Sequence, residues 1–324
     1  MMRTGFCSGR AQIVFGSSDG KMYSLDATTG KPNNDFGDNG IVNLNTEEIL
    51  HGLPGRDALS EPPTVYKNLV ITGGMTQENP PLGPAGDVRA WDMHTGKLVW
   101  TFRTIPAKGE KGNETWAGDS WKNRSGVNVR GFITVDAQRG IAYLPLGAPS
   151  VDQYGGDRAG DNLFSTSLVA VNANTGKYLW HFQVTHHDIW DADMTGAPAL
   201  IDVKKGGKTI PAVIAVSKVG LSFILDRVTG KPIFGVEERA VPQSEVPAGM
   251  YGEDAAISAQ AATPGADGDE AGRHCNGHAG NRSGLQKADG GNADRRPVSS
   301  YRLQPSGGAV PRKSWRRELV WHVV

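Results

Sequence analysis

The most regular pattern in the chain is a short run of alternating apolar residues that ends in a polar turn. In each copy the run is followed by Asp or Asn, two intervening residues and Thr-Gly-Lys; the four copies are 24–31, 90–97, 170–177 and 224–231, with a weaker copy at 134–140. The Asp or Asn side chain can accept hydrogen bonds from the backbone ahead of it, and Gly can adopt the left-handed conformation that closes a tight turn. Because a second apolar run follows, as at 98–102 and 178–182, each copy predicts a β-hairpin.

The spacing of these hairpins predicts how they are assembled. Their Asp or Asn positions are Asp26, Asp92, Asp136, Asn172 and Asp226. Hairpins that recur roughly every 40–50 residues are typical of the blades of a β-propeller. Chance recurrence of a common turn sequence is the alternative, and four near-identical copies argue against it. We therefore expect an all-β chain built as a β-propeller.

Composition agrees with this interpretation and excludes some partners. The chain has 43 glycines among 324 residues, well above the usual share of about 7%, as expected for many tight turns. It has 34 basic and 34 acidic residues, and this balance argues against nucleic acid or an anionic membrane as the main partner. The first residues lack the apolar region of an export signal, and no apolar run approaches the roughly 18 residues of a membrane span.

The densest cluster of reactive side chains is Thr-His-His-Asp-Ile-Trp-Asp-Ala-Asp at 185–193, which follows the strand-like run 178–182. Such a cluster suits a reactive site, a metal site or a hydrogen-bonded turn in which Trp190 packs. Adjacent histidines on a strand point to opposite faces, so His186 and His187 are poorly placed to bind one metal together. A metal-dependent hydrolase that uses them with Asp188 and Asp191 is therefore disfavoured.

The composition changes near the end of the chain. Between residues 258 and 297 the only large apolar residue is Leu285, and the rest is mostly Gly, Ala, Asp, Arg and Asn. Such a segment cannot bury enough apolar surface to offset the entropy lost on ordering. We expect a propeller-type domain over 1–250, and a tail over 251–324 that is disordered or translated in a shifted reading frame.

Two motifs, together with the hairpins, resemble pyrroloquinoline quinone (PQQ)-dependent dehydrogenases, most of all the branch similar to membrane-bound quinoprotein glucose dehydrogenase. The motifs are His-His-Asp-Ile-Trp-Asp-Ala-Asp at 186–193 and Val-Ser-Lys-Val-Gly-Leu-Ser-Phe-Ile-Leu-Asp-Arg at 216–227, and the resemblance runs over about 11–248. Members of this family are eight-bladed propellers. The chain matches about four to five blades, so we expect a partial propeller, an internal piece whose PQQ binding is weak or absent and whose activity is impaired.

The resemblance implies roles for individual residues. Asp191 matches the catalytic base, which takes the proton of the substrate hydroxyl. Lys218, 27 residues later, matches the cation that contacts the quinone oxygens. His187 and Asp188 would orient Asp191.

Three further residues are candidates to contact the cofactor. Asn128 and Arg130 lie in Gly-Val-Asn-Val-Arg-Gly at 126–131, where the family carries a Trp stacked on PQQ, and Arg130 stands where that Trp is expected. Arg can stack on a ring plane and pair with carboxylates. Trp190 is the third candidate.

The resemblance also implies PQQ with Ca²⁺ or Mg²⁺ as cofactors, and the metal ligands are not identified. It implies a small sugar or alcohol as substrate, a quinone or cytochrome as electron acceptor, and a periplasmic location. The alternative is a non-catalytic quinoprotein-like propeller that acts as a binding or assembly module, because such propellers share the same turns.

Overall fold

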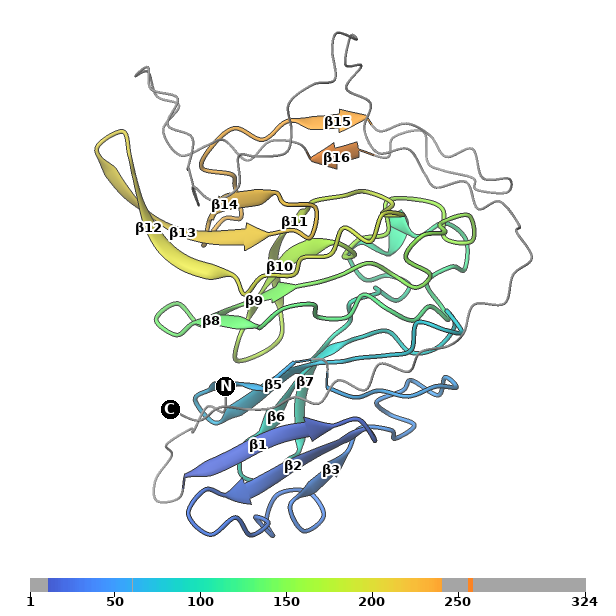
Figure 1. The fold of residues 1–324 in the computed structure, drawn as a ribbon, viewed down its shortest axis with the longest axis vertical. Helices are drawn as coiled ribbons and strands as arrows, with labels where there is room; N and C mark the ends of the chain where they lie inside the picture. Colours follow the sequence, from blue (N-terminus) through green and yellow to red (C-terminus); the bar gives the residue numbers. More distant parts are fainter. Residues whose placement is uncertain (1–10, 60, 241–255, 259–324) are drawn as a thin grey trace, which may run out of the picture. The chain divides into compact units, whose positions relative to one another are not determined.

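A computed structural model describes residues 11–59, 61–240 and 256–258, and over these residues the chain is built from antiparallel strands with a single 3₁₀ turn, η1 (Asn113–Thr115) (Figure 1). Two sheets have four strands each, in the orders β4-β5-β6-β7 and β11-β10-β9-β8. Two sheets have three strands, β1-β2-β3 and β12-β13-β14, and β15 pairs with β16. The prediction of an all-β chain is confirmed.

The strand bounds follow in chain order. They are β1 (Gln12–Ser17), β2 (Lys21–Asp26), β3 (Ile41–Asn43), β4 (Thr64–Tyr66), β5 (Leu69–Gly73), β6 (Val88–Asp92), β7 (Leu98–Phe102), β8 (Thr134–Asp136), β9 (Ile141–Pro145), β10 (Ser167–Asn172), β11 (Tyr178–Gln183), β12 (Ala199–Lys205), β13 (Lys208–Val216), β14 (Ser222–Asp226), β15 (Glu238–Ala240) and β16 (Ala256–Ser258). The chain runs up and down through each of the four larger sheets, so every sheet is a meander of neighbouring strands.

The repeated turn has the geometry that its residues predict. Asp26 ends β2, and its Oδ1 accepts hydrogen bonds from the backbone N–H groups of Thr28 and Thr29 at 2.9 and 2.8 Å. Gly30 completes the turn with φ of +69°. The other copies repeat both features: the side chains of Asp92, Asp136, Asn172 and Asp226 accept the same pair of bonds, and their glycines have φ between +66° and +72°.

The prediction that every copy is a β-hairpin is correct for three copies and wrong for two. After Asp92, Asp136 and Asn172 the chain returns at once as β7, β9 and β11. In the copies at Asp26 and Asp226 the return is a single bridge, to Pro32 and to Pro232. Proline has no N–H to donate to the ladder, and so it prevents a regular strand from forming there.

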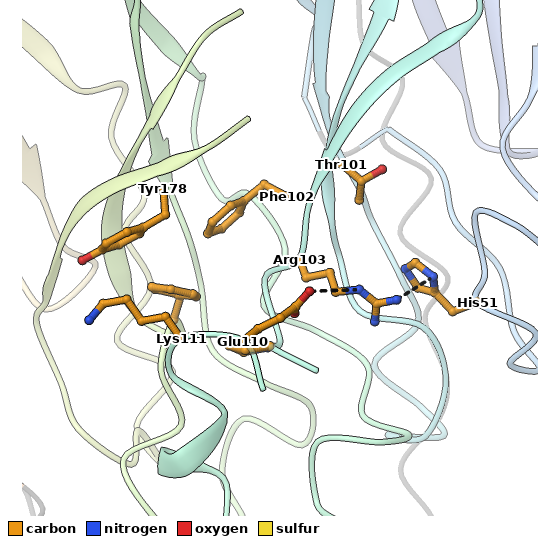
Figure 2. Close-up of a pocket in the computed structure, with 9 residues that line it drawn as sticks. His51, Thr101, Phe102, Arg103, Glu110, Lys111 and Tyr178 are labelled. Atoms are coloured by element: carbon orange, nitrogen blue, oxygen red, sulfur yellow. Dashed lines mark hydrogen bonds and ion pairs between the residues drawn. The ribbon is translucent and has the colours of Figure 1, made fainter. Parts of the chain in front are cut away.

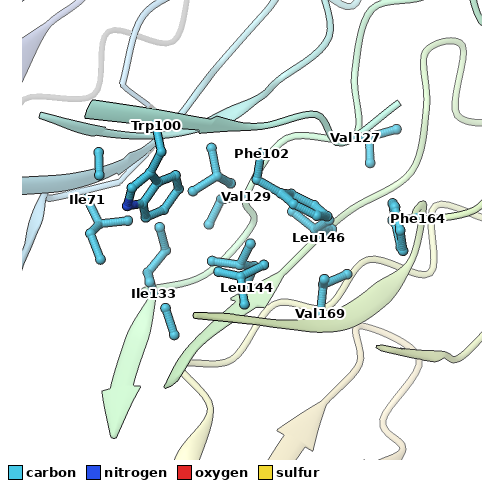
Figure 3. Packing of buried hydrophobic residues seen from close by; sticks show 14 of the residues in the cluster. Ile71, Trp100, Phe102, Val127, Val129, Ile133, Leu144, Leu146, Phe164 and Val169 are labelled. Carbon is cyan, nitrogen blue, oxygen red and sulfur yellow. The ribbon is translucent and has the colours of Figure 1, made fainter. Parts of the chain in front are cut away.

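Each pair of neighbouring sheets encloses its own apolar core. The inner strand β9 is buried on both faces. Ile141 and Tyr143 belong to the core shared with β12-β13-β14, while Ala142 and Leu144 belong to the core shared with β4-β5-β6-β7. Figure 3 shows the second of these cores, with Leu144 of β9 packed near Val169 and Ile133. A third core lies between β1-β2-β3 and β4-β5-β6-β7. Sheets that pack face to face in series, each with its central strands buried, are the arrangement expected of propeller blades.

In each four-stranded sheet, one tryptophan packs against the turn of the next sheet. Trp100 on β7 donates a hydrogen bond from Nε1 to the carbonyl of Ala173 at 3.3 Å, and a Cβ built on Gly176 would lie 2.6 Å from the indole. Trp180 on β11 packs in the same way against Gly230 of the following turn. The glycine of each repeated turn therefore closes the turn and also lets the preceding tryptophan approach closely.

The predictions for the tail, including the boundary at 250 and the disordered or frame-shifted segment 251–324, lie outside the described residues apart from the backbone of β16. Within the part of the chain that the structure describes, no helix is both long and apolar enough to cross a membrane.

Candidate active site

The candidate site is formed where the loop after β11 meets the turn between β13 and β14. The backbone N–H of Thr195 donates to Val216 at 3.1 Å, and that of Lys218 donates to Asp193 at 2.8 Å. The hydroxyl of Ser217 donates to the carbonyl of Ala192 at 3.0 Å. These bonds hold the two segments in register, and so they fix which side chains of the two predicted motifs face each other.

Asp191 and Lys218 are the pair that this register brings together. The ammonium group of Lys218 contacts Oδ2 of Asp191, and this hydrogen bond raises the pKa of Lys218. Asp191 has φ of +57°, a left-handed conformation uncommon for a residue other than glycine. Its second oxygen, Oδ1, is buried and has no hydrogen-bond partner within residues 11–59, 61–240 and 256–258. One oxygen of the carboxylate is thus held by Lys218, and the other makes no hydrogen bond within the described residues.

Asp188 fixes the conformation of the loop on both sides of Asp191. Its carboxylate is fully buried and accepts hydrogen bonds from the backbone N–H of Trp190 at 2.9 Å and from that of Ala192 at 2.8 Å. The hydroxyl of Thr166 donates to the same carboxylate at 2.9 Å. Burial raises the pKa of Asp188, while these three bonds oppose that rise. Asp188 therefore holds the backbone on both sides of Asp191.

The two histidines of the motif have different neighbours. His187 is buried, and its ring nitrogen Nδ1 lies 2.7 Å from the carbonyl of Gly160. Burial lowers the pKa of His187, so its ring is neutral near pH 7 and Nδ1 donates to that carbonyl. This bond anchors the loop to the segment around residue 160. The other histidine, His186, lies 3.5 Å from Glu238. Trp190, the residue before Asp191, is partly exposed.

Arg130 is brought to the same place from the segment that precedes β8. Its Nη2 donates to Oε1 of Glu78 at 2.8 Å, and its Nε lies 3.6 Å from Oδ2 of Asp193. Nε is buried and has no hydrogen-bond partner within the described chain. Gly147 makes this approach possible, because a Cβ there would lie 2.5 Å from Cγ of Arg130 and 2.4 Å from Oδ1 of Asp193.

Asn128, the other candidate of that segment, has a structural role. It is buried, and its side-chain oxygen accepts from the backbone N–H of Thr76 at 3.1 Å and from its hydroxyl at 3.2 Å. That oxygen also lies where a side chain on Gly86 would be. Asn128 joins the loop after β5 to the segment that carries Arg130.

Sequence reasoning missed a second carboxyl group at the centre of the site. Oδ1 of Asp193 accepts from the backbone N–H of Ala148 at 2.8 Å, and Oδ2 lies 3.7 Å from Nζ of Lys218. Burial, reinforced by the neighbouring charge of Asp191, raises the pKa of Asp193 to about 7. Its position two residues after Asp191, in the same polar motif, was the available signal.

Two more carboxyl groups come from distant segments. Glu78 pairs with Arg130, and burial together with the charges of Asp191 and Glu78 raises the pKa of Asp152 to about 6. Nothing in the sequence around Glu78 or Asp152 indicates that these residues belong to the site. The site therefore combines two cations with a group of partly buried carboxyl groups. The described residues contain no set of three or more His, Cys, Asp or Glu side chains placed to hold a metal ion.

Comparison with known proteins places the chain in a family. Residues 3–270 match the PQQ family described as glucose/ethanol/alcohol dehydrogenase, beta-propeller domain, and the chain belongs to this family. It is 39% identical over 230 residues to quinoprotein glucose dehydrogenase A of Acinetobacter calcoaceticus, covering 70% of this chain and 28% of that protein. It is 35% identical over 243 residues to the quinate/shikimate dehydrogenase (quinone) of Acinetobacter baylyi, covering 74% of this chain and 30% of that protein.

Solved structures give the same fold. The quinohemoprotein alcohol dehydrogenase of Comamonas testosteroni is 29% identical with a TM-score of 0.59, covering 76% of this chain and 36% of that one. The quinohemoprotein alcohol dehydrogenase ADHIIG of Pseudomonas putida HK5 is 27% identical with a TM-score of 0.58, covering 71% and 34%. The prediction of a partial quinoprotein propeller is confirmed, and the chain spans about a third or less of the length of each of these relatives.

Proposed function

We propose that the site around Asp191 is the proton-accepting part of a PQQ-dependent dehydrogenase that oxidises a hydroxyl group of a small sugar or alcohol. The observation that carries this proposal is the contact between Asp191 and Lys218, which pairs a carboxylate with a cation, while the other carboxylate oxygen has no hydrogen-bond partner among the described residues. A general base needs a carboxylate oxygen that can take up a proton, and we assign this role to Oδ1 of Asp191.

The residues of the site fit the chemistry of the cofactor. PQQ is a tricarboxylic quinone, and when bound it supplies the hydride acceptor for the oxidation. Lys218 and Arg130 are the two cations of the site, and Lys218 is 48% exposed. Nε of Arg130 is buried and makes no hydrogen bond within the described chain, although it lies 3.6 Å from Oδ2 of Asp193. We assign Lys218 and Arg130 to binding the anionic cofactor, with Trp190 at its edge.

Each residue of the site has its own role in this proposal. Oδ1 of Asp191 accepts the hydroxyl proton. Lys218 stabilises negative charge that develops on an oxygen beside it, since a fixed cation lowers the energy of such charge. Asp188 and His187 hold the loop that positions Asp191, through the bonds to Trp190, Ala192 and Gly160. In this proposal Asn128 supports the segment of Arg130 and does not contact the cofactor.

The substrate, the electron acceptor and the location belong to the same proposal. The relatives named above include a glucose dehydrogenase, a quinate/shikimate dehydrogenase with quinone in its name and quinohemoprotein alcohol dehydrogenases. We accordingly propose a sugar or alcohol as substrate, a quinone or a cytochrome as acceptor, and a periplasmic location.

One observation favours a second candidate, a non-catalytic propeller that acts as a binding or assembly module. Arg130 already pairs with Glu78 and Lys218 already pairs with Asp191, so both cations have partners within the chain. In that case the cluster stabilises the contact between two sheets, and PQQ has no specific place in it.

Binding of PQQ separates the two candidates. Purified chain is titrated with PQQ in the presence of Ca²⁺ or Mg²⁺, up to concentrations that detect weak binding, and cofactor absorbance is followed. We expect Lys218→Met to weaken binding by about tenfold to a hundredfold, the value of a hydrogen bond to a charged group. Lys122→Met is the matched control, because Lys122 is an exposed lysine paired with Asp119 outside the site. Equal binding by the two variants contradicts the proposal and favours the binding module.

A further inference from the structure

A pocket of about 390 Å³ lies between the end of β7 and the start of β11 and shares no lining residue with the site around Asp191 (Figure 2). Thr101, Phe102 and Arg103 line it from the β7 side, and Tyr178 lines it from β11. The loop between β7 and η1 contributes Glu110 and Lys111. Its volume lies in the range of small-molecule sites.

Aromatic rings form one wall of this pocket. The ring of Phe164 lies 5.3 Å from that of Phe102 and 5.7 Å from that of Tyr178, measured between centroids, and both pairs are tilted. Phe102 and Phe164 are almost fully buried, so the core behind them fixes their positions. A flat aromatic ligand can pack against such a wall in an offset or edge-to-face arrangement.

Two cations border the aromatic wall. Nζ of Lys111 lies 5.4 Å from the centroid of the Tyr178 ring, and Lys111 forms no ion pair within the described part of the chain. Arg103 lies on the other side, with its Nε a loose 3.9 Å from Oε1 of Glu110. Glu110 is also held by the backbone, since its Oε2 accepts from the N–H of Ala107 at 2.7 Å. The pocket therefore has two cations and one carboxylate, and the charge of Lys111 is not offset by an ion pair.

Arg103 is contacted by His51, which also lines the pocket and links it to the buried Asp87. Nη2 of Arg103 donates to Nδ1 of His51 at 3.3 Å (Figure 2). Nε2 of His51 lies 2.8 Å from Oδ2 of Asp87. Nδ1 of His51 therefore accepts from Arg103 and Nε2 faces Asp87, so the ring bridges the two residues. Asp87 is 1% exposed and pairs with the buried Arg89. Such support restricts the guanidinium to one direction, which is a property of binding sites built for a ligand.

We propose that this pocket binds a small aromatic monocarboxylate, with its ring against Phe102 and Tyr178 and its carboxylate directed to Lys111 and Arg103. A single carboxylate matches Lys111, which has no ion pair among the described residues, and the flat ring matches the aromatic wall. His181 lies next to the pocket, with its Nδ1 2.9 Å from the hydroxyl oxygen of Tyr178. Burial, together with the charge of Lys111, lowers the pKa of His181 to about 4. This inference is independent of the function proposed for Asp191.

Benzoate and benzyl alcohol are suitable probes, because they share the ring and differ in the charge. Binding to the purified chain is measured without PQQ by isothermal titration and by saturation-transfer NMR. We expect benzoate to bind with a dissociation constant of about 1 mM or lower, as for a ligand of this size. Benzyl alcohol should bind at least about tenfold more weakly, because it cannot form the charge-assisted contacts.

Three lysine variants locate the binding. Lys111→Met keeps the apolar stem and removes the charge, and it should weaken benzoate binding by about tenfold. Lys122→Met is the matched control, because Lys122 also lies over an aromatic ring, that of Trp121, at 5.9 Å. Lys218→Met tests the site around Asp191. Both of the last two variants should bind benzoate as the wild type does.

Each other result overturns the proposal. Benzoate binding that is lost in Lys218→Met places the ligand at the site around Asp191, and equal weakening in Lys111→Met and Lys122→Met indicates a general charge effect. Equal binding of benzoate and benzyl alcohol removes the role of the carboxylate, and absence of benzoate binding removes the site. PQQ takes no part in these measurements, so their failure is distinct from a failure of the dehydrogenase proposal.

Discussion

The ammonium group of Lys218 contacts the carboxylate of Asp191, although 27 residues separate them in the chain. The contact follows from backbone bonds between the loop after β11 and the turn after β13, above all the bond from the N–H of Lys218 to the carbonyl of Asp193. Any change that shifts this register is expected to separate the two side chains, even if both residues remain.

Asp188 should be the residue on which the conformation of this loop depends most. Asp188→Ala removes the acceptor for two backbone N–H groups and for Thr166, and we expect a loss of about 1–3 kcal/mol in the free energy of unfolding. Asp188→Asn keeps one side-chain oxygen and should cost less. Urea unfolding measures both variants. An Ala variant as stable as the wild type would show that these bonds do not hold the loop.

Asp193 should make the stability of the chain depend on pH. Its pKa is about 7 in the folded chain and about 3.9 in an unfolded one, so between these values the folded chain holds a proton that the unfolded chain has released. The contribution of Asp193 to the free energy of unfolding is therefore largest below about pH 4, and it is lost as pH rises towards 7. In Asp193→Asn this contribution is absent.

The measurement is unfolding of wild type and Asp193→Asn across this pH range. Between pH 5 and pH 8 the wild type should lose on the order of 2 kcal/mol relative to the variant. Carbon-13 NMR of the Asp193 carboxyl group gives its pKa directly, and Asp191→Asn should lower that pKa because a neighbouring negative charge is removed. Titration of Asp193 near its ordinary value would refute this description of the site.

The repeated turns offer a matched pair of glycines that separates backbone strain from packing. Gly30 and Gly176 both have φ of +69°, but a Cβ on Gly30 meets no described residue within 4 Å, whereas one on Gly176 lies 2.6 Å from the Trp100 indole. Gly30→Ala should cost about 1 kcal/mol, from the left-handed backbone alone. Gly176→Ala should cost about 1–3 kcal/mol more, from overpacking. Urea unfolding gives both values. Equal losses in the free energy of unfolding would mean that the packing of Trp100 against Gly176 does not stabilise the contact between the two sheets.

Local sequence was sufficient to predict the turns, because the bonds of the Asp or Asn side chain and the left-handed glycine lie within a few residues of each other. It was also sufficient for the strand directly after three of the turns. The two exceptions carried a visible signal, since Pro32 and Pro232 follow Lys31 and Lys231 directly. The rule that proline interrupts a ladder predicts a short bridge in both places.

The site was predictable only in part. The two motifs and their spacing pointed to Asp191 and Lys218, and the structure brings these two side chains together. The partners of Arg130 could not be predicted, because Glu78 and Asp193 reach it from other loops only after the sheets have packed. The raised pKa of Asp193 has the same origin, since it depends on burial that no short stretch of sequence encodes.

The central claim is that Asp191 accepts the proton during a PQQ-dependent oxidation. Dye reduction is measured with purified chain, PQQ, Ca²⁺ or Mg²⁺, and glucose or a simple alcohol, for the wild type, Asp191→Asn and Asp202→Asn, whose native Asp202 is 66% exposed and lies on β12. We predict a slow reduction that requires added PQQ, that Asp202→Asn leaves unchanged and that Asp191→Asn lowers by about 10²–10⁴-fold, the usual contribution of a general base. Reduction that persists in Asp191→Asn, or the absence of any PQQ-dependent reduction, contradicts the claim.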